Sequence, residues 1–215
     1  MRFLLPVGGV VDHRFGILTS YKHKGVPVGI VQGMDWAGDN NCFRHGFKPD
    51  LFFPWLDSVK PYLKTCLFIA CPDAVSDAIA TLDLYRQWAF QIKKRGFPLA
   101  FVAQDGQEDL DFPLVFDALF IGGSTEWKES EAAIECINRA QRLGKHIHIG
   151  RVNWYRRYQL FRQVRGSDDF TCDGTRQRYE GIEKTVEAWA SYMERPYQRR
   201  LEICTLDVGN KEAIQ

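Results

Sequence analysis

The chain has 215 residues, of which 45% are hydrophobic and 26% are charged, and its formal net charge is +1 at pH 7. We expect one soluble globular domain over residues 1–215, and so small a net charge excludes a protein that attracts nucleic acid by its overall charge. The sequence has neither the roughly 18 to 20 uninterrupted apolar residues of a membrane span nor the features of a signal peptide, so we expect a cytoplasmic protein without a membrane partner.

Apolar runs of strand length recur along the chain. They lie at residues 2–7, 28–33, 66–71, 98–104, 118–123, 146–152 and 169–172. Most are apolar throughout rather than alternating, which is typical of strands covered on both faces. Helical patterns separate several of them, at residues 74–95, 128–143, 154–165 and 177–194.

This alternation predicts an α/β fold with a parallel sheet built from right-handed βαβ units. Seven or eight strands favour a compact (β/α)8 barrel of the TIM type, with an open doubly wound parallel sheet as the alternative. Because such a barrel typically needs ~250 residues, several connections are expected to be loops, most obviously the Pro- and aromatic-rich stretch 47–62.

The cysteines and histidines give no sign of a metal or cofactor. The six cysteines include no CxxC pair, and several lie inside predicted strands or helices, so we expect them to be reduced. His146 and His148 alternate within a predicted strand, where a place in the core or barrel wall explains them better than a metal site does. The sequence also lacks a Walker loop, a GxGxxG motif and a serine nucleophile elbow.

Polar residues follow nearly every apolar run. They include Asp39, Asp73, Gln104, Asp105, Gly122, Gly123, Glu126, Arg151, Asn153, Asp173 and Arg176. The carboxyl ends of parallel strands are where barrels and doubly wound sheets place their chemistry. These residues are therefore the candidates for a functional site.

Some of these residues also have a purely structural explanation. Asp73 precedes a predicted helix and is suited to be its N-cap. Asp105 belongs to an Asp-Gly turn, and Gly122 and Gly123 are suited to a tight turn between strand and helix.

Asp39 and Asp173 have no obvious capping role for a long helix. Asp39 lies in the turn "DWAGDNNCF" (35–43), and Asp173 follows the last apolar run. The first and last strands of a parallel order become neighbours when a barrel closes, so the two carboxylates are expected to converge. Two convergent carboxylates are the minimum set for glycosidic chemistry, in which one attacks the anomeric carbon and the other transfers the proton.

Arginines are concentrated towards the C-terminal part of the chain. Arg156, Arg157, Arg176 and Arg178 are candidates for binding the phosphates of a nucleic acid. A solvated helix face with arginines spread around it explains the same pattern.

Six ordered segments resemble the tRNA-guanine transglycosylase superfamily. They read "DNNCF", "CPD", "FVAQDGQ", "FDALFIGGSTEWK", "HIGRVN" and "CDGTR" within about residues 28–180. The resemblance is closest to the phage branch, which puts 7-deazaguanine bases into DNA. Family members are (β/α)8 barrels that exchange guanine for a 7-deazaguanine through a covalent glycosyl-enzyme ester. The resemblance thus implies a pentosyltransferase that uses no cofactor and acts on DNA rather than RNA, with a 7-deazaguanine base as its second substrate.

The resemblance also implies the catalytic pair. Asp39 takes the place of the aspartate in the family's "DSGGF" and would be the general acid/base. Asp173 would be the nucleophile, although the family's "FDC" reads "FTCDG" here, which puts Thr171 at the expected aspartate. Asp169 is the alternative nucleophile.

The same resemblance implies the base-binding residues. Asp73 and Gln104 would hydrogen-bond the edge of the base, and Gly122 and Gly123 would offer it backbone groups. Asn153, from "HIGRVN", is a further candidate for substrate binding.

Three departures from the family favour DNA, or a free nucleoside, over tRNA. The chain is much shorter, and it lacks the Cys/His zinc cluster of the tRNA enzymes. The family's "GGLAVGE" reads "GGSTEWK", which leaves Glu126 and Lys128 both available for the role of its glutamate. The rival hypothesis is a non-catalytic barrel that binds nucleic acid or a protein partner, in which Asp39 and Asp173 need not share a pocket.

Overall fold

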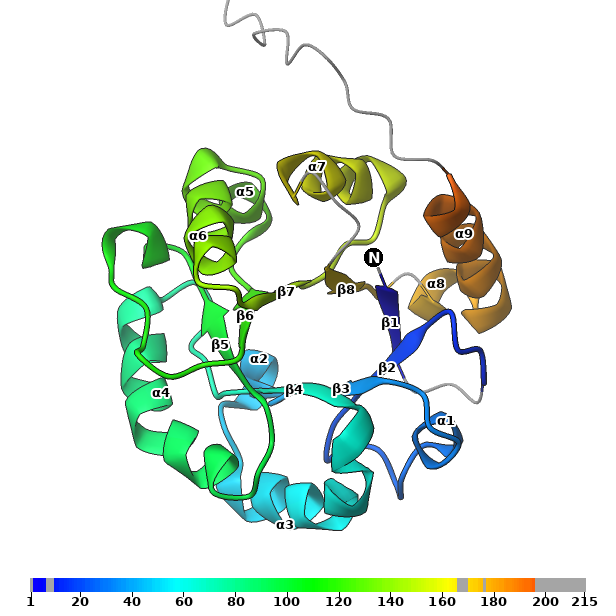
Figure 1. The fold of residues 1–215 in the computed structure, drawn as a ribbon, viewed down its shortest axis with the longest axis horizontal. Helices are drawn as coiled ribbons and strands as arrows, with labels where there is room; N and C mark the ends of the chain where they lie inside the picture. The colour runs from blue at the N-terminus through cyan, green and yellow to red at the C-terminus, as the bar shows by residue number, and fades with distance from the viewer. Residues whose placement is uncertain (1, 7–9, 166–169, 176, 196–215) are drawn as a thin grey trace, which may run out of the picture.

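The strands of the protein form a closed parallel barrel. The computed structural model describes residues 2–6, 10–165, 170–175 and 177–195. Within these residues eight strands pair in chain order, and the last pairs with the first. They are β1 (Arg2–Pro6), β2 (Gly16–Thr19), β3 (Trp36–Gly38), β4 (Cys66–Ala70), β5 (Leu99–Ala103), β6 (Ala118–Ile121), β7 (His146–Ile149) and β8 (Thr171–Asp173). The predicted (β/α)8 barrel is confirmed, and the open sheet is wrong (Figure 1).

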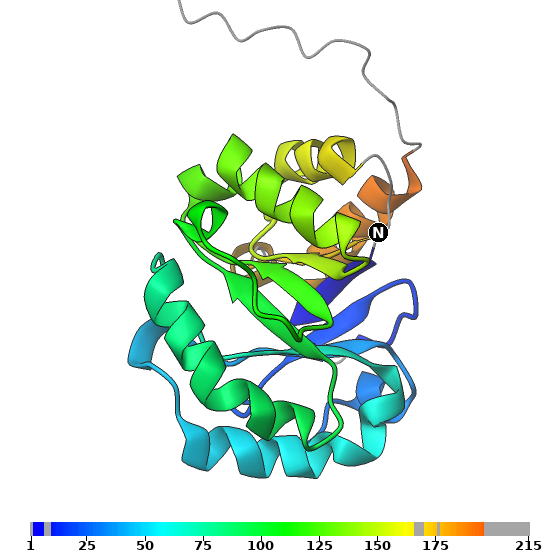
Figure 2. The same ribbon diagram turned by 60° about the vertical axis from the view of Figure 1, so that its left-hand side comes forward.

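Helices surround the barrel, as the two views show (Figures 1 and 2). They are α1 (Val28–Val31), α2 (Cys42–His45), α3 (Pro49–Val59), α4 (Ala78–Lys93), α5 (Thr125–Lys128), α6 (Glu131–Arg142), α7 (Tyr155–Arg165), α8 (Gln177–Glu180) and α9 (Ile182–Glu194), with 3-10 turns η1 (Lys60–Thr65) and η2 (Gln107–Asp109). In the described part of the chain, none of these helices combines the length and the apolar character needed to cross a membrane.

The interior of the barrel is filled by a few complementary side chains. Ala37, Ala100 and Ala118 are fully buried on three different strands, and their small volume leaves room for larger neighbours. Phe68 of β4 occupies this space and meets Phe120 of β6 edge to face, with ring centroids 6.1 Å apart. This packing makes the barrel interior a filled core, so a ligand has access only at an end of the barrel.

Two strands differ from the sequence prediction. The run 28–33 is not a strand: Val28–Val31 forms the single turn α1, which buries Ile30. The strands of this region are β2 and β3, and the sequence pattern missed both. Asp35 and Asp39 border β3, and the polar segment 20–24 follows β2 directly, so neither strand forms an apolar run of its own. A short apolar run does not by itself distinguish a strand from a buried helical turn.

The predicted loop at 47–62 is also wrong, because α3 occupies most of it. Pro49 lies in the first turn, where a missing N–H removes no intrahelical hydrogen bond. Phe52, Trp55, Leu56 and Val59 are buried at helical spacing, so packing on the barrel stabilises a helix that also contains Pro54. The chain is instead shortened around β1 to β3, where residues 10–15 contain no helix and α1 is one turn long.

Three predicted helices begin later or are divided. The helix expected at 74–95 begins at Ala78, and its N-cap is Asp77, whose side chain accepts a hydrogen bond from the Ala80 N–H at 2.9 Å. Asp73 is therefore not the cap. The segment expected at 128–143 forms α6 after a break from α5, and the segment at 177–194 is divided at Gly181, where φ is +83°.

Candidate active site

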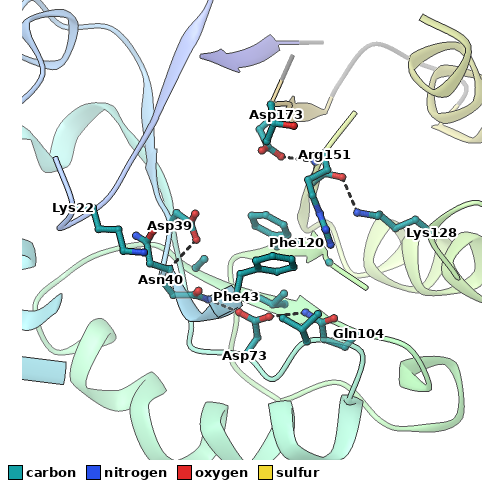
Figure 3. Close-up of a pocket in the computed structure, with 17 residues that line it drawn as sticks. Lys22, Asp39, Asn40, Phe43, Asp73, Gln104, Phe120, Lys128, Arg151 and Asp173 are labelled. Carbon is teal, nitrogen blue, oxygen red and sulfur yellow. Dashed lines mark hydrogen bonds between the residues drawn. The ribbon is translucent and has the colours of Figure 1, made fainter. Parts of the chain in front are cut away.

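A cavity of about 370 Å³ lies at the carboxyl ends of the strands (Figure 3). It is lined by Lys22, Asp39, Asn40, Asn41, Phe43, Ala70, Asp73, Val75, Val102, Gln104, Phe120, Gly122, Lys128, Gly150, Arg151, Asp173 and Thr175. Asp39 follows β3, Asp73 follows β4 and Asp173 ends β8. Barrel closure thus brings three carboxylates that are far apart in the sequence to one cavity.

Asp39 is held by the turn that follows β3. Its N–H donates to the Thr19 carbonyl at 2.8 Å, which extends the β2–β3 pairing by one residue. Its Oδ1 accepts from the N–H of Asn41, a residue with a left-handed φ of 55°. Burial raises the pKa of Asp39, and the nearby charge of Asp173 acts in the same direction. The environment therefore favours a carboxyl group that can hold a proton.

Asp173 lies in the opposite kind of environment. Its Oδ1 accepts from the Arg151 N–H at 2.8 Å and lies 3.4 Å from His148 Nε2. Burial alone would raise the pKa of Asp173, but His148, the Arg151 N–H and the charge of Lys128 together lower it. Asp173 is therefore held as a carboxylate, whereas Asp39 is biased towards its acid form.

Asp73 and Gln104 form a hydrogen-bonded group on the cavity wall with Asn40. Asp73 accepts from Asn40 Nδ2 and from Gln104 Nε2, each at 2.6 Å. Burial is the main cause that raises the pKa of Asp73 to about 6. A carboxylate has about four lone-pair sites, so Asp73 keeps acceptor capacity towards the cavity.

Gly122 and Gly123 help to position Gln104. They do not form a pair of backbone groups that both face the cavity. A side chain at Gly122 would place its Cβ 2.6 Å from Gln104 Nε2, so only glycine fits there. Gly123 has a φ of +70°, and its N–H donates to Gln104 Oε1 at 2.8 Å. Its carbonyl accepts from the Arg151 guanidinium at 2.9 Å. Gly122 lines the cavity, whereas Gly123 acts through Gln104 and Arg151.

Asn153 and Asp105 hold loops together at the mouth. Asn153 Oδ1 accepts from the Thr175 N–H at 2.7 Å, which fixes the loop after β8, and Asn153 is not among the lining residues. Asp105 accepts from the N–H and the hydroxyl of Ser124, at 2.8 and 2.6 Å. Asp105 therefore ties together the loops after β5 and β6, a contact that its Asp-Gly turn did not predict.

Three cations line the cavity without a role assigned by sequence reasoning: Lys22, Lys128 and Arg151. Lys128 is only 1% exposed, its Nζ donates to the Gly150 carbonyl at 3.1 Å, and burial lowers its pKa to about 7. Glu126, the other residue of that segment, is exposed. Arg151 has a φ of +59° and places its guanidinium 5.2 Å from the Phe43 ring centroid. Its position directly after "HIHIG" is a signal that could have identified it.

Two aromatic rings also line the cavity and were missed. Phe43 comes from α2, four residues after Asp39, and is 62% exposed at the mouth. Phe120 comes from β6, inside the barrel, and Figure 3 shows both rings beside the carboxylates. A planar apolar ligand could stack on such rings while its edge meets polar groups.

The predicted phosphate-binding arginines are only partly described. Arg156 is exposed. Arg157 donates to Glu129 at 2.6 Å and to the Arg151 carbonyl at 3.0 Å, so its charge is partly used within the protein. Arg176 and the side chain of Arg178 lie outside the described residues, as does Asp169.

The cysteines that are described are buried, and no disulfide joins any two of them: Cys42, Cys66, Cys71, Cys136 and Cys172. Among the described residues, no group of three or more His, Cys, Asp and Glu side chains is placed to hold a metal ion. Comparison of the chain with protein-family models and with curated protein sequences finds no match.

Proposed function

We propose that the protein is a base-exchange pentosyltransferase that replaces guanine in nucleic acid with a 7-deazaguanine through a covalent aspartyl-glycosyl intermediate. Phage DNA in the host cytoplasm is the favoured substrate. The observation that supports this most directly is that Asp39 and Asp173 line one cavity while their pKa values are shifted in opposite directions. Two carboxyl groups whose environments separate their pKa values divide the work of acid and nucleophile between them.

In the first half-reaction Asp173 attacks C1′ of the target nucleotide. A bond forms between the carboxylate oxygen and C1′, and the bond between C1′ and N9 of guanine breaks. The electron pair of that bond stays on guanine, which takes a proton from the acid form of Asp39. The products are free guanine, a glycosyl ester of Asp173 and the Asp39 carboxylate.

In the second half-reaction the incoming 7-deazaguanine replaces guanine in the cavity. The Asp39 carboxylate takes the N9 proton of the new base, and N9 attacks C1′. The ester bond breaks, and Asp173 leaves as a carboxylate. The low pKa of Asp173 makes it a good leaving group in this step.

The chemistry of the cavity wall suits a guanine-like base. Guanine presents N–H donors on its Watson–Crick edge next to a carbonyl acceptor. Asp73 has acceptor sites left for the donors, and Gln104 Nε2 has one further N–H available for the carbonyl. Phe43 and Phe120 provide faces for the ring system.

A polymer substrate must present this base outside the duplex. The reacting groups lie inside a cavity at the barrel mouth, so a paired base has to be flipped out to reach them. Arg156 is an exposed cation on α7, close in sequence to the loop that carries Arg151, and is available for phosphate.

The alternative is a barrel that binds nucleic acid or a protein partner without chemistry. It gives no reason for two carboxyl groups on separate strands to share a cavity with opposed pKa shifts. Binding alone requires neither a held carboxylate nor a carboxyl group that retains a proton.

Exchange of labelled guanine out of DNA in the presence of a 7-deazaguanine base tests the proposal. The wild-type protein should release the label, and a protein–DNA adduct should survive on denaturing gels. Asp83→Asn is the matched control, because Asp83 is exposed on α4, does not line the cavity, and forms its ion pair within the described residues with Arg86. Absence of exchange with both single- and double-stranded DNA would rule out the proposed function.

A further inference from the structure

A line of polar side chains runs through the barrel interior beneath Asp173. His146 and His148 belong to β7, and Thr171 belongs to β8. His148 is fully buried and Thr171 is 4% exposed. The Phe120 and Phe68 rings lie 4.4 and 5.0 Å from His148, so the imidazole has apolar neighbours on these sides. Polar groups in such a place need definite hydrogen-bond partners.

The distances join these residues into one line. Thr171 Oγ1 is 2.8 Å from His146 Nε2 and 2.9 Å from His148 Nδ1. The other nitrogen of His148, Nε2, lies 3.4 Å from Asp173 Oδ1. The line therefore runs from His146 through Thr171 and His148 to the carboxylate.

The direction of the hydrogen bonds follows from the end of the line. A carboxylate only accepts, so the 3.4 Å contact with Asp173 Oδ1 favours the His148 tautomer that carries its proton on Nε2. The neutral imidazole then has a lone pair on Nδ1, which accepts the hydroxyl proton of Thr171. Thr171 Oγ1 in turn accepts from His146 Nε2–H. In this arrangement Thr171 links the two imidazoles, and His148 Nε2 faces Asp173 Oδ1 across 3.4 Å without a hydrogen bond of ordinary geometry.

The line also divides the two oxygens of Asp173. Oδ1 accepts the Arg151 N–H and faces His148 Nε2. Oδ2 accepts no hydrogen bond from the described residues, and Asp173 lines the cavity. We infer that His148, held in one tautomer by Thr171, is a positioning residue that fixes Asp173 so that Oδ2 is the attacking oxygen. This inference rests on the proposed function for its catalytic meaning, but the tautomer is a property of the free protein.

Three other groups also affect the ionisation of the Asp173 carboxylate. Arg151 follows β7, Lys128 comes from α5, and Asp39 faces Asp173 from the end of β3. Replacing Thr171 leaves all three in place. A change seen in a Thr171 variant therefore reports on the line through His148.

Thr171→Val and Thr171→Ser separate the hydroxyl from the shape of the side chain. ¹⁵N NMR of the full chain should show wild-type His148 protonated at Nε2 and unprotonated at Nδ1. Thr171→Val should mix the tautomers, whereas Thr171→Ser should keep the wild-type signal. Thr185→Val is the control, because Thr185 is also fully buried but donates to Gly181 on the outside of the barrel.

Activity gives the second readout. Thr171→Val should lower kcat about tenfold with KM unchanged, the size expected for loss of one hydrogen bond to a charged group. The acid limb of its pH–rate profile should move to higher pH, because a His148 that is no longer held in the Nε2–H tautomer stabilises the Asp173 carboxylate less. If Thr171→Val does not fold, His148→Gln, which keeps an N–H near the position of Nε2, should retain more activity than His148→Leu.

The outcomes separate the two proposals. An Nδ1–H tautomer of His148 in the wild-type protein, or an acid limb and tautomer unchanged in Thr171→Val, would overturn the positioning role. An Nε2–H tautomer that depends on Thr171, in a protein that never exchanges guanine, would support the arrangement in the free protein and reject the proposed function.

Discussion

The two sides of the barrel mouth treat their carboxyl groups differently. On the β3 side Asp39 accepts the backbone N–H of Asn41, and burial raises its pKa despite the opposing charge of Lys22. On the β7–β8 side Asp173 faces His148 and Lys128, and its pKa is lowered. The pKa of the same side chain is thus shifted upwards on one wall and downwards on the other. Burial alone therefore does not determine the pKa of each carboxyl group, because neighbours from adjacent loops set the direction of the shift.

Asp173→Asn should have the largest effect on base exchange, because it removes the carboxylate of the β7–β8 side. The amide keeps the shape but has no negative charge, so no glycosyl ester should form. Exchange should fall by at least ~10⁴-fold, the range seen when a nucleophile is removed. Base binding should survive, and a titration with free guanine checks this. Persistence of a covalent adduct in this variant would transfer the nucleophilic role to another residue, with Asp169 as the first candidate.

Asp39→Asn should have a smaller effect, because the attacking group remains. Loss of proton transfer should slow exchange by ~10²- to 10⁴-fold. The adduct should still form slowly, and single-turnover gels follow its appearance. An equal loss of adduct in both Asn variants would show that the two walls do not divide the roles.

Lys128→Met removes the buried cation from the β7–β8 side. The folded protein lowers the pKa of Lys128 from 10.5 to about 7, so its folded state disfavours the charged form. The destabilisation is fully present below pH 7 and diminishes as pH rises towards 10.5. Lys128→Met should therefore raise the free energy of unfolding by about 1 to 3 kcal/mol at pH 7 and by less at pH 10. Urea unfolding at the two pH values measures this, and a larger gain at pH 10 would contradict it.

Base binding should weaken on acidification, because Asp73 is needed as an acceptor. Its pKa is raised to about 6, so the carboxylate is lost as pH falls through that value. Guanine affinity should drop about tenfold between pH 7 and pH 5, since one pH unit below a pKa leaves about a tenth of the group ionised. Calorimetry measures the affinity, and Asp73→Asn should make it independent of pH in this range.

The smallest effect is expected at the exposed arginine outside the cavity. Arg156→Ala should weaken DNA binding a few-fold and reduce the salt slope by about one, as expected for one phosphate contact. Arg157→Ala should change the slope less, because Arg157 is already paired with Glu129. Fluorescence anisotropy at several salt concentrations compares them. A flat salt response in the wild-type protein would favour a free base or nucleoside as substrate.

Much of this architecture could be predicted from the sequence. Long runs such as 66–71 and 98–104 are apolar throughout because both faces of a barrel strand are buried, and this pattern predicts the parallel barrel. Polar residues after the runs 66–71 and 169–172 identify Asp73 and Asp173 as occupants of the mouth, whereas Asp39 follows β3, a strand that the sequence pattern did not identify. β2 and β3 were missed because polar residues lie directly beside these short segments, so neither forms an apolar run of its own.

The parts of the site that could not be predicted depend on tertiary contacts. Lys128 lies in a polar segment and is buried only because α5 turns it beneath the mouth. Likewise, His148 shows no special spacing, and its place beside Asp173 arises from the β7–β8 register. Gln104 donates a hydrogen bond to Asp73 and accepts one from Gly123, and these residues lie on loops that come together only when the barrel closes.

Peptide mapping of the trapped protein–DNA adduct tests the central claim most directly. After nuclease digestion and proteolysis, mass spectrometry should find the sugar ester on Asp173 and on no other carboxyl group. Asp39→Asn should give the same modified residue in lower yield. An ester on Asp39 or Asp169, or exchange without any ester, would contradict the division of roles between the two walls of the mouth.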